Sequence, residues 1–172
     1  MESVILDANV VIKLHELQLW HRVRAKCQVH LAETVVQEVD YYEINAQQIW
    51  IDKQALRSEC APFSVTPEQV RCFLSQFDRS YQDRLDLGEL ESLVYLFSQR
   101  TAPGHLLICS ADSIVWQILG CLNKPDHGIS LEELLKQLGL TKHLERQYTE
   151  DFRVHWSKRG SQDWIQGRGK KR

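Results

Sequence analysis

Apolar residues along the chain fall into short continuous runs, separated by longer stretches in which they recur every three or four positions. The continuous runs predict strands at residues 4–6 and 106–110, and another short strand fits residues 27–32. Strands that are apolar on both faces are typical of a parallel sheet covered by helices on each side. Because the predicted strands alternate with predicted helices, the pattern indicates an α/β domain with a mainly parallel central sheet.

Capping residues mark three of the predicted helix starts. They are Thr66 followed by Pro67, Asp86, and Ser130 with Glu133 at the capping-box position and Gly139 as the C-cap. Apolar spacing and stop signals predict further helices over residues 10–23, 35–46 (capped by Thr34), 111–120 (ended by Gly120) and 140–160. Residues 50–67 show no clear periodicity, and we interpret them as a short strand or a lid-like excursion.

The composition is that of an ordinary globular domain, with 43% apolar and 26% charged residues among 172. No apolar stretch approaches the roughly 18 residues of a membrane span, and the N-terminus has no secretory signal. The five cysteines are scattered and form no CxxC pair, which argues against a disulfide framework or a zinc site. We therefore expect a cytoplasmic protein without a membrane partner.

Charge is distributed unevenly along the chain. Residues 153–172 carry seven Lys or Arg residues and one acid, Asp163, or +6, so the remainder carries 14 basic and 22 acidic side chains, or −8. We accordingly divide the chain into a domain at residues 1–150 and a C-terminal helix end with a basic tail at 151–172. Two interpretations of the tail stay open: it binds a polyanionic partner, or it is a solvated segment.

Four acids are placed so that they can meet. Asp7 follows the first predicted strand and Asp112 the third, while Glu38 and Glu89 lie on predicted helices. The carboxyl ends of parallel strands form one edge of a sheet, where α/β proteins bind their ligands. Each acid alone is explained by a turn, a cap or the helix dipole. Four together would repel one another unless a cation lay between them, and oxygen ligands alone select Mg²⁺ or Mn²⁺.

Four segments, "VILDANVVIKL", "ETVVQEV", "DLGELES" and "LLICSAD", resemble the acidic motifs of the PIN domain in their expected order. The resemblance covers roughly residues 3–120. It implies a PIN-like three-layer α/β/α fold and a metal-dependent nuclease, usually a ribonuclease. By position, the residues that it implies as metal-binding and catalytic are Asp7, Glu38, Glu89 and Asp112, with Asn9 and Ser110 as polar supports.

The third motif departs from the common pattern, in which an Asp is the third acid. This chain has Glu89 followed by Glu91, similar to a form found in part of the family. Two residues lie about 200° apart around a helix, so we favour Glu89 and keep Glu91 as an additional candidate ligand. The implied reaction is metal-assisted hydrolysis of RNA that leaves 5′-phosphate and 3′-hydroxyl ends.

Substrate contacts are less defined. The candidate RNA-binding cations are Lys13, Lys170, Lys171 and Arg172, and Trp156 and Trp164 could stack on bases. For Lys13, a position on an exposed helix face is the favoured interpretation. The resemblance leaves two further partners open, a small antitoxin-like protein and a second copy of the chain. The alternative function is a PIN-like nucleic-acid or protein binding module that retains the acids but catalyses weakly. A haloacid dehalogenase is disfavoured, because position 9 is Asn where that class needs Asp.

Overall fold

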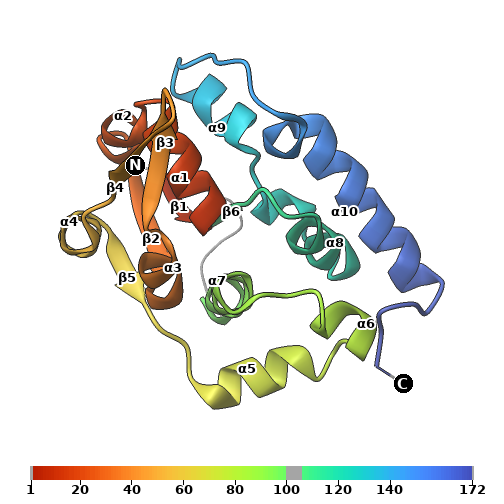
Figure 1. Cartoon of the computed structure of the whole chain (residues 1–172). Helices are drawn as coiled ribbons and strands as arrows, with labels where there is room; N and C mark the ends of the chain where they lie inside the picture. Colours follow the sequence, from red (N-terminus) through yellow and green to blue (C-terminus); the bar gives the residue numbers. More distant parts are fainter. Residues whose placement is uncertain (1, 100–105, 172) are drawn as a thin grey trace.

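The computed structural model describes residues 2–99 and 106–171, and its centre is a four-stranded parallel sheet (Figure 1). The strands lie in the order β5-β2-β1-β6, with bounds β1 Glu2–Leu6, β2 Cys27–Ala32, β5 Ala61–Phe63 and β6 Leu106–Cys109. In register, Val4 of β1 lies opposite Val29 of β2 and Leu107 of β6. The predicted α/β class is therefore confirmed, and the arrangement is consistent with three α/β/α layers.

The direction of the chain reverses once across the sheet. It passes from β1 outward to β2 and β5, and then returns past β1 to β6 on the other side. Such a reversal leaves a crevice beyond the carboxyl ends of the two strands that flank it, and this crevice is the usual ligand site of open α/β sheets. The crevice lies between β1 and β6, the strands that Asp7 and Asp112 follow.

The helices follow the predicted caps closely. Thr66, Asp86 and Ser130 each form a capping box at the start of their helices. The helix bounds are α1 Ala8–Glu16, α2 Trp20–Arg24, α3 Glu33–Glu38, α4 Lys53–Glu59, α5 Pro67–Leu74, α6 Arg79–Gln82, α7 Leu87–Ser98, α8 Ser113–Cys121, α9 Leu131–Gln137 and α10 Glu150–Ile165, with short 3₁₀ turns at Pro125–His127 and Arg146–Tyr148.

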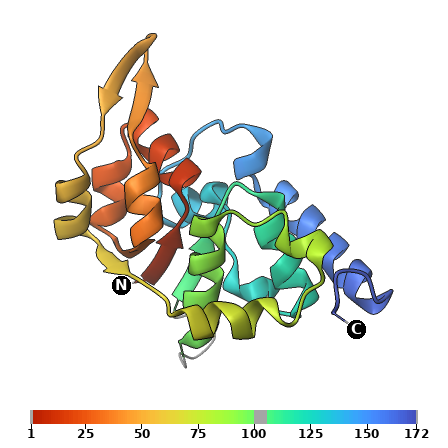
Figure 2. The same ribbon diagram turned by 60° about the horizontal axis from the view of Figure 1, so that its bottom comes forward.

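The predicted helix over residues 35–46 is wrong. α3 ends at Glu38, and the chain continues into an antiparallel hairpin of β3 (Tyr41–Ile44) and β4 (Gln47–Trp50), which projects from the body in Figure 2. Its two-residue turn places Asn45 and Ala46 at φ 51° and 61°. Two successive positive φ values are typical of a tight hairpin turn. The apolar spacing that suggested a helix belongs instead to a ribbon with one face toward α1.

Three other helix predictions need correction. The helix over 10–23 is two helices, separated by Gln18 at φ 56°. α8 continues through Gly120 to Cys121, and the last helix, α10, begins at Glu150 and runs to Ile165. Residues 50–67, which gave no clear pattern, contain α4 and β5.

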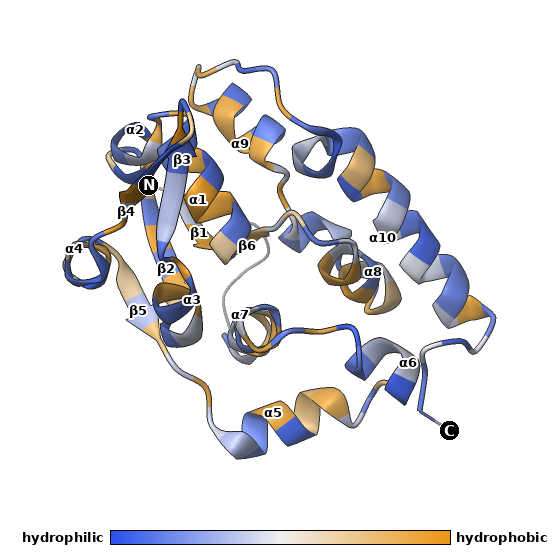
Figure 3. Cartoon of the chain, viewed as in Figure 1, coloured by the Kyte–Doolittle hydropathy of each residue, from blue (hydrophilic) through white to orange (hydrophobic). Residues whose placement is uncertain are grey.

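Close contact between α8 and α10 explains why Gly120 does not end its helix. A Cβ at Gly120 would overlap the backbone carbonyl of Ser157, and one at Gly160 would overlap that of Gln117. The glycines therefore let two helix backbones approach each other. Figure 3 shows mainly apolar residues along α8 and mainly polar residues along α10. The predicted tail is thus largely a helix packed on the body.

The strands supply much of the core. Ile5, Leu6, Leu31 and Ile108 are at most 1% exposed, as their continuous apolar runs predicted. In the part of the chain that the structure describes, no helix has the length and apolar character needed to cross a membrane.

Candidate functional site

Asp7 is a buried carboxylate at the end of β1, where it caps α1. Its Oδ1 accepts a hydrogen bond from the backbone N–H of Val10 (2.8 Å), and its Oδ2 accepts from Ser110 Oγ (2.5 Å) and Ala111 N–H (3.0 Å). Asp7 is only 5% exposed, and burial raises its pKa, although these hydrogen bonds lower it in part. The bonds hold the side chain in one position at the crevice between β1 and β6.

Asp112 and Ser110 join the two strand ends. Asp112 caps α8 by accepting from Ile114 N–H (2.9 Å), and its own N–H donates to Ser110 Oγ (3.0 Å). Ser110 is fully buried and donates in turn to Asp7. The predicted polar support at Ser110 therefore lies between the two predicted acids.

Glu89 and Asp86 approach from the N-terminus of α7. Asp86 Oδ1 accepts from Glu89 N–H (2.7 Å), and Glu89 Oε2 accepts from Asp86 N–H (3.2 Å). Glu89 is 6% exposed, and its pKa is raised to about 8, first by burial and then by the charges of Asp112 and Asp86. Carboxylates raise one another's pKa only at close range, so the acids of α7 and the strand ends share one electrostatic site.

Glu38 completes the group from the last position of α3. Its pKa is raised, first by partial burial and then by the charge of Asp86. Glu91, the additional candidate ligand, accepts a hydrogen bond from Thr34 Oγ1 (2.7 Å). The hydroxyl that was predicted to cap α3 therefore binds Glu91 instead, and α3 begins two residues earlier than predicted, after Ala32.

We call Asp7, Glu38, Asp86, Glu89 and Asp112 the acid cluster. The first four line a pocket with a volume of about 10 Å³, together with Asn9 and Gly88. This is about the smallest volume that holds a single water molecule.

Gly88 keeps that pocket open. A Cβ on this residue would lie 2.9 Å from Val35 Cγ2 and 3.2 Å from Glu38 Oε2. Any side chain at position 88 would therefore enter the space between α3 and α7. Asn9 lies at the rim of the pocket and is exposed, with its backbone carbonyl 3.4 Å from the hydroxyl of Tyr148.

The cluster suits a hard cation by its chemistry. The ionisable side chains that line the pocket are all carboxylic acids, whose oxygens are the ligands that Mg²⁺ and Mn²⁺ prefer. Within residues 2–99 and 106–171, no three His, Cys, Asp or Glu side chains form a ready-made metal-binding group. Asp7, Glu89 and Asp112 each direct an oxygen at a backbone N–H. Ligation would therefore require these carboxylates to turn from their backbone hydrogen bonds toward the pocket that Gly88 leaves open.

The predicted RNA-binding cations lie apart from this pocket. Lys13 pairs with Glu16 (2.6 Å) and Glu145 (2.7 Å), and its side chain is 13% exposed, so its charge is already balanced. Lys170 lies 5.2 Å from the ring centroid of Trp164, and the backbone of Lys171 bonds to the loop before α6. Arg172 lies outside the described residues.

Sequence reasoning missed Asp86 as a member of the site. It was assigned only a capping role, which it does fill. The available signal was its spacing from Glu89, because a capping box places both carboxylates at the same end of one helix.

The fold and the pocket together define an acid-lined site at the crossover point of a parallel α/β sheet. No family model, curated protein or solved structure matches the chain.

Proposed function

We propose that the chain is a PIN-like, metal-dependent ribonuclease that hydrolyses RNA phosphodiester bonds and leaves 5′-phosphate and 3′-hydroxyl ends. The observation that supports it is the acid cluster: carboxylates from α3, α7 and the end of β1 line one small pocket, and Asp112, after β6, lies close enough to raise the pKa of Glu89. Asp7 and Glu89 are buried close to further carboxylates, an arrangement that is unfavourable without a cation.

Mg²⁺ or Mn²⁺ would be held by Asp7, Glu38, Glu89 and Asp112, and Asp86 joins this set from the structure. Bound there, the ion would lower the pKa of a water and offset charge on the scissile phosphate. Asp7 is the positioned member, because three hydrogen bonds fix it. Glu89 holds a proton near neutral pH when no ion is present and releases it as a cation arrives, so metal affinity should rise toward pH 8.

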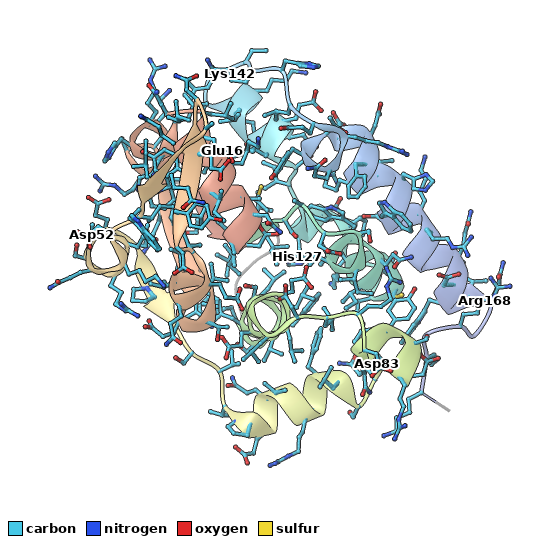
Figure 4. The ribbon with its side chains drawn as sticks, viewed as in Figure 1. Glu16, Asp52, Asp83, His127, Lys142 and Arg168 are labelled. Carbon is cyan, nitrogen blue, oxygen red and sulfur yellow. The ribbon has the colours of Figure 1, made fainter. Side chains whose placement is uncertain are left out.

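The test is cleavage of an end-labelled, mixed RNA pool with Mn²⁺, Mg²⁺ or EDTA. Asp7→Asn removes the charge but keeps a residue that caps a helix equally well. Asp52→Asn is the matched control, because Asp52 also caps a helix but lies at the far edge of the molecule in Figure 4. We expect metal-dependent cleavage by the wild type and the control, and its loss in Asp7→Asn.

Equal cleavage by Asp7→Asn and the wild type would reject the site. If neither protein cleaves but calorimetry shows metal binding that Asp7→Asn lacks, the binding-module alternative takes over. An antitoxin-like partner and a homodimer stay predictions from the sequence.

A further inference from the structure

A second hollow, with a volume of about 620 Å³, lies between the loop before α7 and the helices α8 and α10. We call it the α8–α10 groove; the lining residues that matter here are Arg84, Gln117, Trp156, Lys158, Arg159 and Asp163. Three of these are exposed cations. The single carboxylate, Asp163, already accepts a hydrogen bond from Tyr81 and lies near two arginines, so the groove is net positive.

Two buried polar atoms in this groove lack a hydrogen bond. Gln117 is 3% exposed, and its Oε1 has no partner among the described residues; the same holds for Nε1 of Trp156. Both atoms lie beneath the surface of the groove. The parts of the groove that a ligand can meet are the three exposed cations and the ring of Trp156, which suit an anionic ligand.

One side of the groove, at Arg84, lies near Asp112 of the acid cluster. Arg84 Nη2 donates to Ser113 Oγ (3.4 Å), and Ser113 directly follows Asp112 in the chain. A strand whose scissile phosphate lies at the acid cluster would therefore reach this positive groove within a short distance. Its volume of about 620 Å³ is within the range of ligand pockets.

We propose that the α8–α10 groove binds the phosphodiester backbone of single-stranded RNA next to the cleavage site. This inference rests on the proposed function and adds the part of the protein that holds the substrate. Arg84 and Lys158 neutralise phosphates, and the ring of Trp156, which lines the groove, packs against the strand. Grooves that combine cations with aromatic side chains are the common means of binding single strands.

The test is fluorescence anisotropy of a labelled single-stranded RNA, measured in EDTA over a series of salt concentrations. Arg84→Gln/Lys158→Gln removes two groove cations. Arg22→Gln/Lys142→Gln is the matched control, since it removes one exposed Arg and one exposed Lys elsewhere. Figure 4 shows Lys142 at the opposite side of the molecule from the end of α10.

Each phosphate contact on a single strand contributes about 0.7 to the slope of log affinity against log salt. The groove variant should therefore lower the slope by about 1.4 and weaken binding about 10- to 60-fold near 50 mM salt. The control should keep the wild-type slope.

The inference would be overturned if the groove variant had the affinity and salt slope of the wild type. It would also be overturned if the control lost as much affinity as the groove variant, because that loss would reflect net charge alone. Because EDTA prevents metal-dependent cleavage, this result is independent of the nuclease test. Groove-dependent binding without cleavage would reject the proposed function and keep the groove. If Asp7→Asn loses cleavage while the groove variant binds RNA as tightly as the wild type, the proposed function is kept and the groove is rejected.

Discussion

Glu89→Gln should stabilise the protein when no metal is present. Gln keeps the size of the side chain and serves equally well at the third position of a capping box. It removes a carboxylate whose pKa is raised from 4.5 to about 8 by burial and by its acidic neighbours. The folded protein therefore holds a proton that the unfolded chain has released. This stabilising effect is complete below about pH 4.5 and is lost as the pH rises through about 8.

The interval between the two pKa values sets the magnitude. At about 1.4 kcal/mol for each pH unit, the carboxylate costs about 3 kcal/mol at pH 7 and at most about 5 kcal/mol above pH 8. The Gln side chain does not titrate. The free energy of unfolding of Glu89→Gln should therefore exceed that of the wild type by this amount at high pH and equal it near pH 4.5.

Urea unfolding in EDTA at several pH values measures the difference. Glu68→Gln is the matched control: Glu68 also lies in the first turn of a helix, but its side chain is 73% exposed. The free energy of unfolding of the control should stay within about 0.5 kcal/mol of the wild-type value at every pH. Added Mn²⁺ should stabilise the wild type more than Glu89→Gln. A Glu89→Gln protein no more stable than the wild type near pH 8 would refute the electrostatic argument.

Three further substitutions test the packing around the two sites. Gly88→Ala should abolish most metal-dependent cleavage, because the methyl group enters the pocket. The free energy of unfolding should change by no more than about 1 kcal/mol, since alanine favours the helix. Retained cleavage would show that the pocket is not used. Ser110→Ala removes a buried donor to Asp7 and should cost about 1–3 kcal/mol in urea unfolding; wild-type stability would contradict that bond. Gly160→Ala should cost at least about 2 kcal/mol, because α8 and α10 must separate, and an unchanged midpoint would count against their close contact.

Local signals in the sequence were enough for the strands and several helix starts. The strand at 27–32 and the capping boxes at Thr66 and Ser130 are confirmed, because strand propensity and helix capping depend mainly on residues close together in the sequence. The β3–β4 hairpin was missed because its apolar residues fit a helical spacing, and only the turn at Asn45 and Ala46 distinguishes the two structures. Gly120 was misjudged because its neighbour, α10, lies about forty residues away in sequence.

The acid cluster shows where such reasoning ends. Asp7, Asp86 and Asp112 each cap a helix, and the partial positive charge of a helix N-terminus stabilises a carboxylate there. The same residue types at the same positions serve helix capping and metal binding, so the sequence of any one segment cannot separate the two roles.

Glu38 is the acid that helix stability does not explain. It is the last residue of α3, where the helix dipole disfavours negative charge, and its pKa is raised by burial and by Asp86. Glu38 is nevertheless exposed to solvent, and what makes its charge unfavourable in the ion-free chain is the helix terminus and the nearby carboxylates. A divalent cation in the pocket beside Gly88 would reverse both electrostatic costs at once, which makes Glu38 the strongest single argument that the cluster is a binding site.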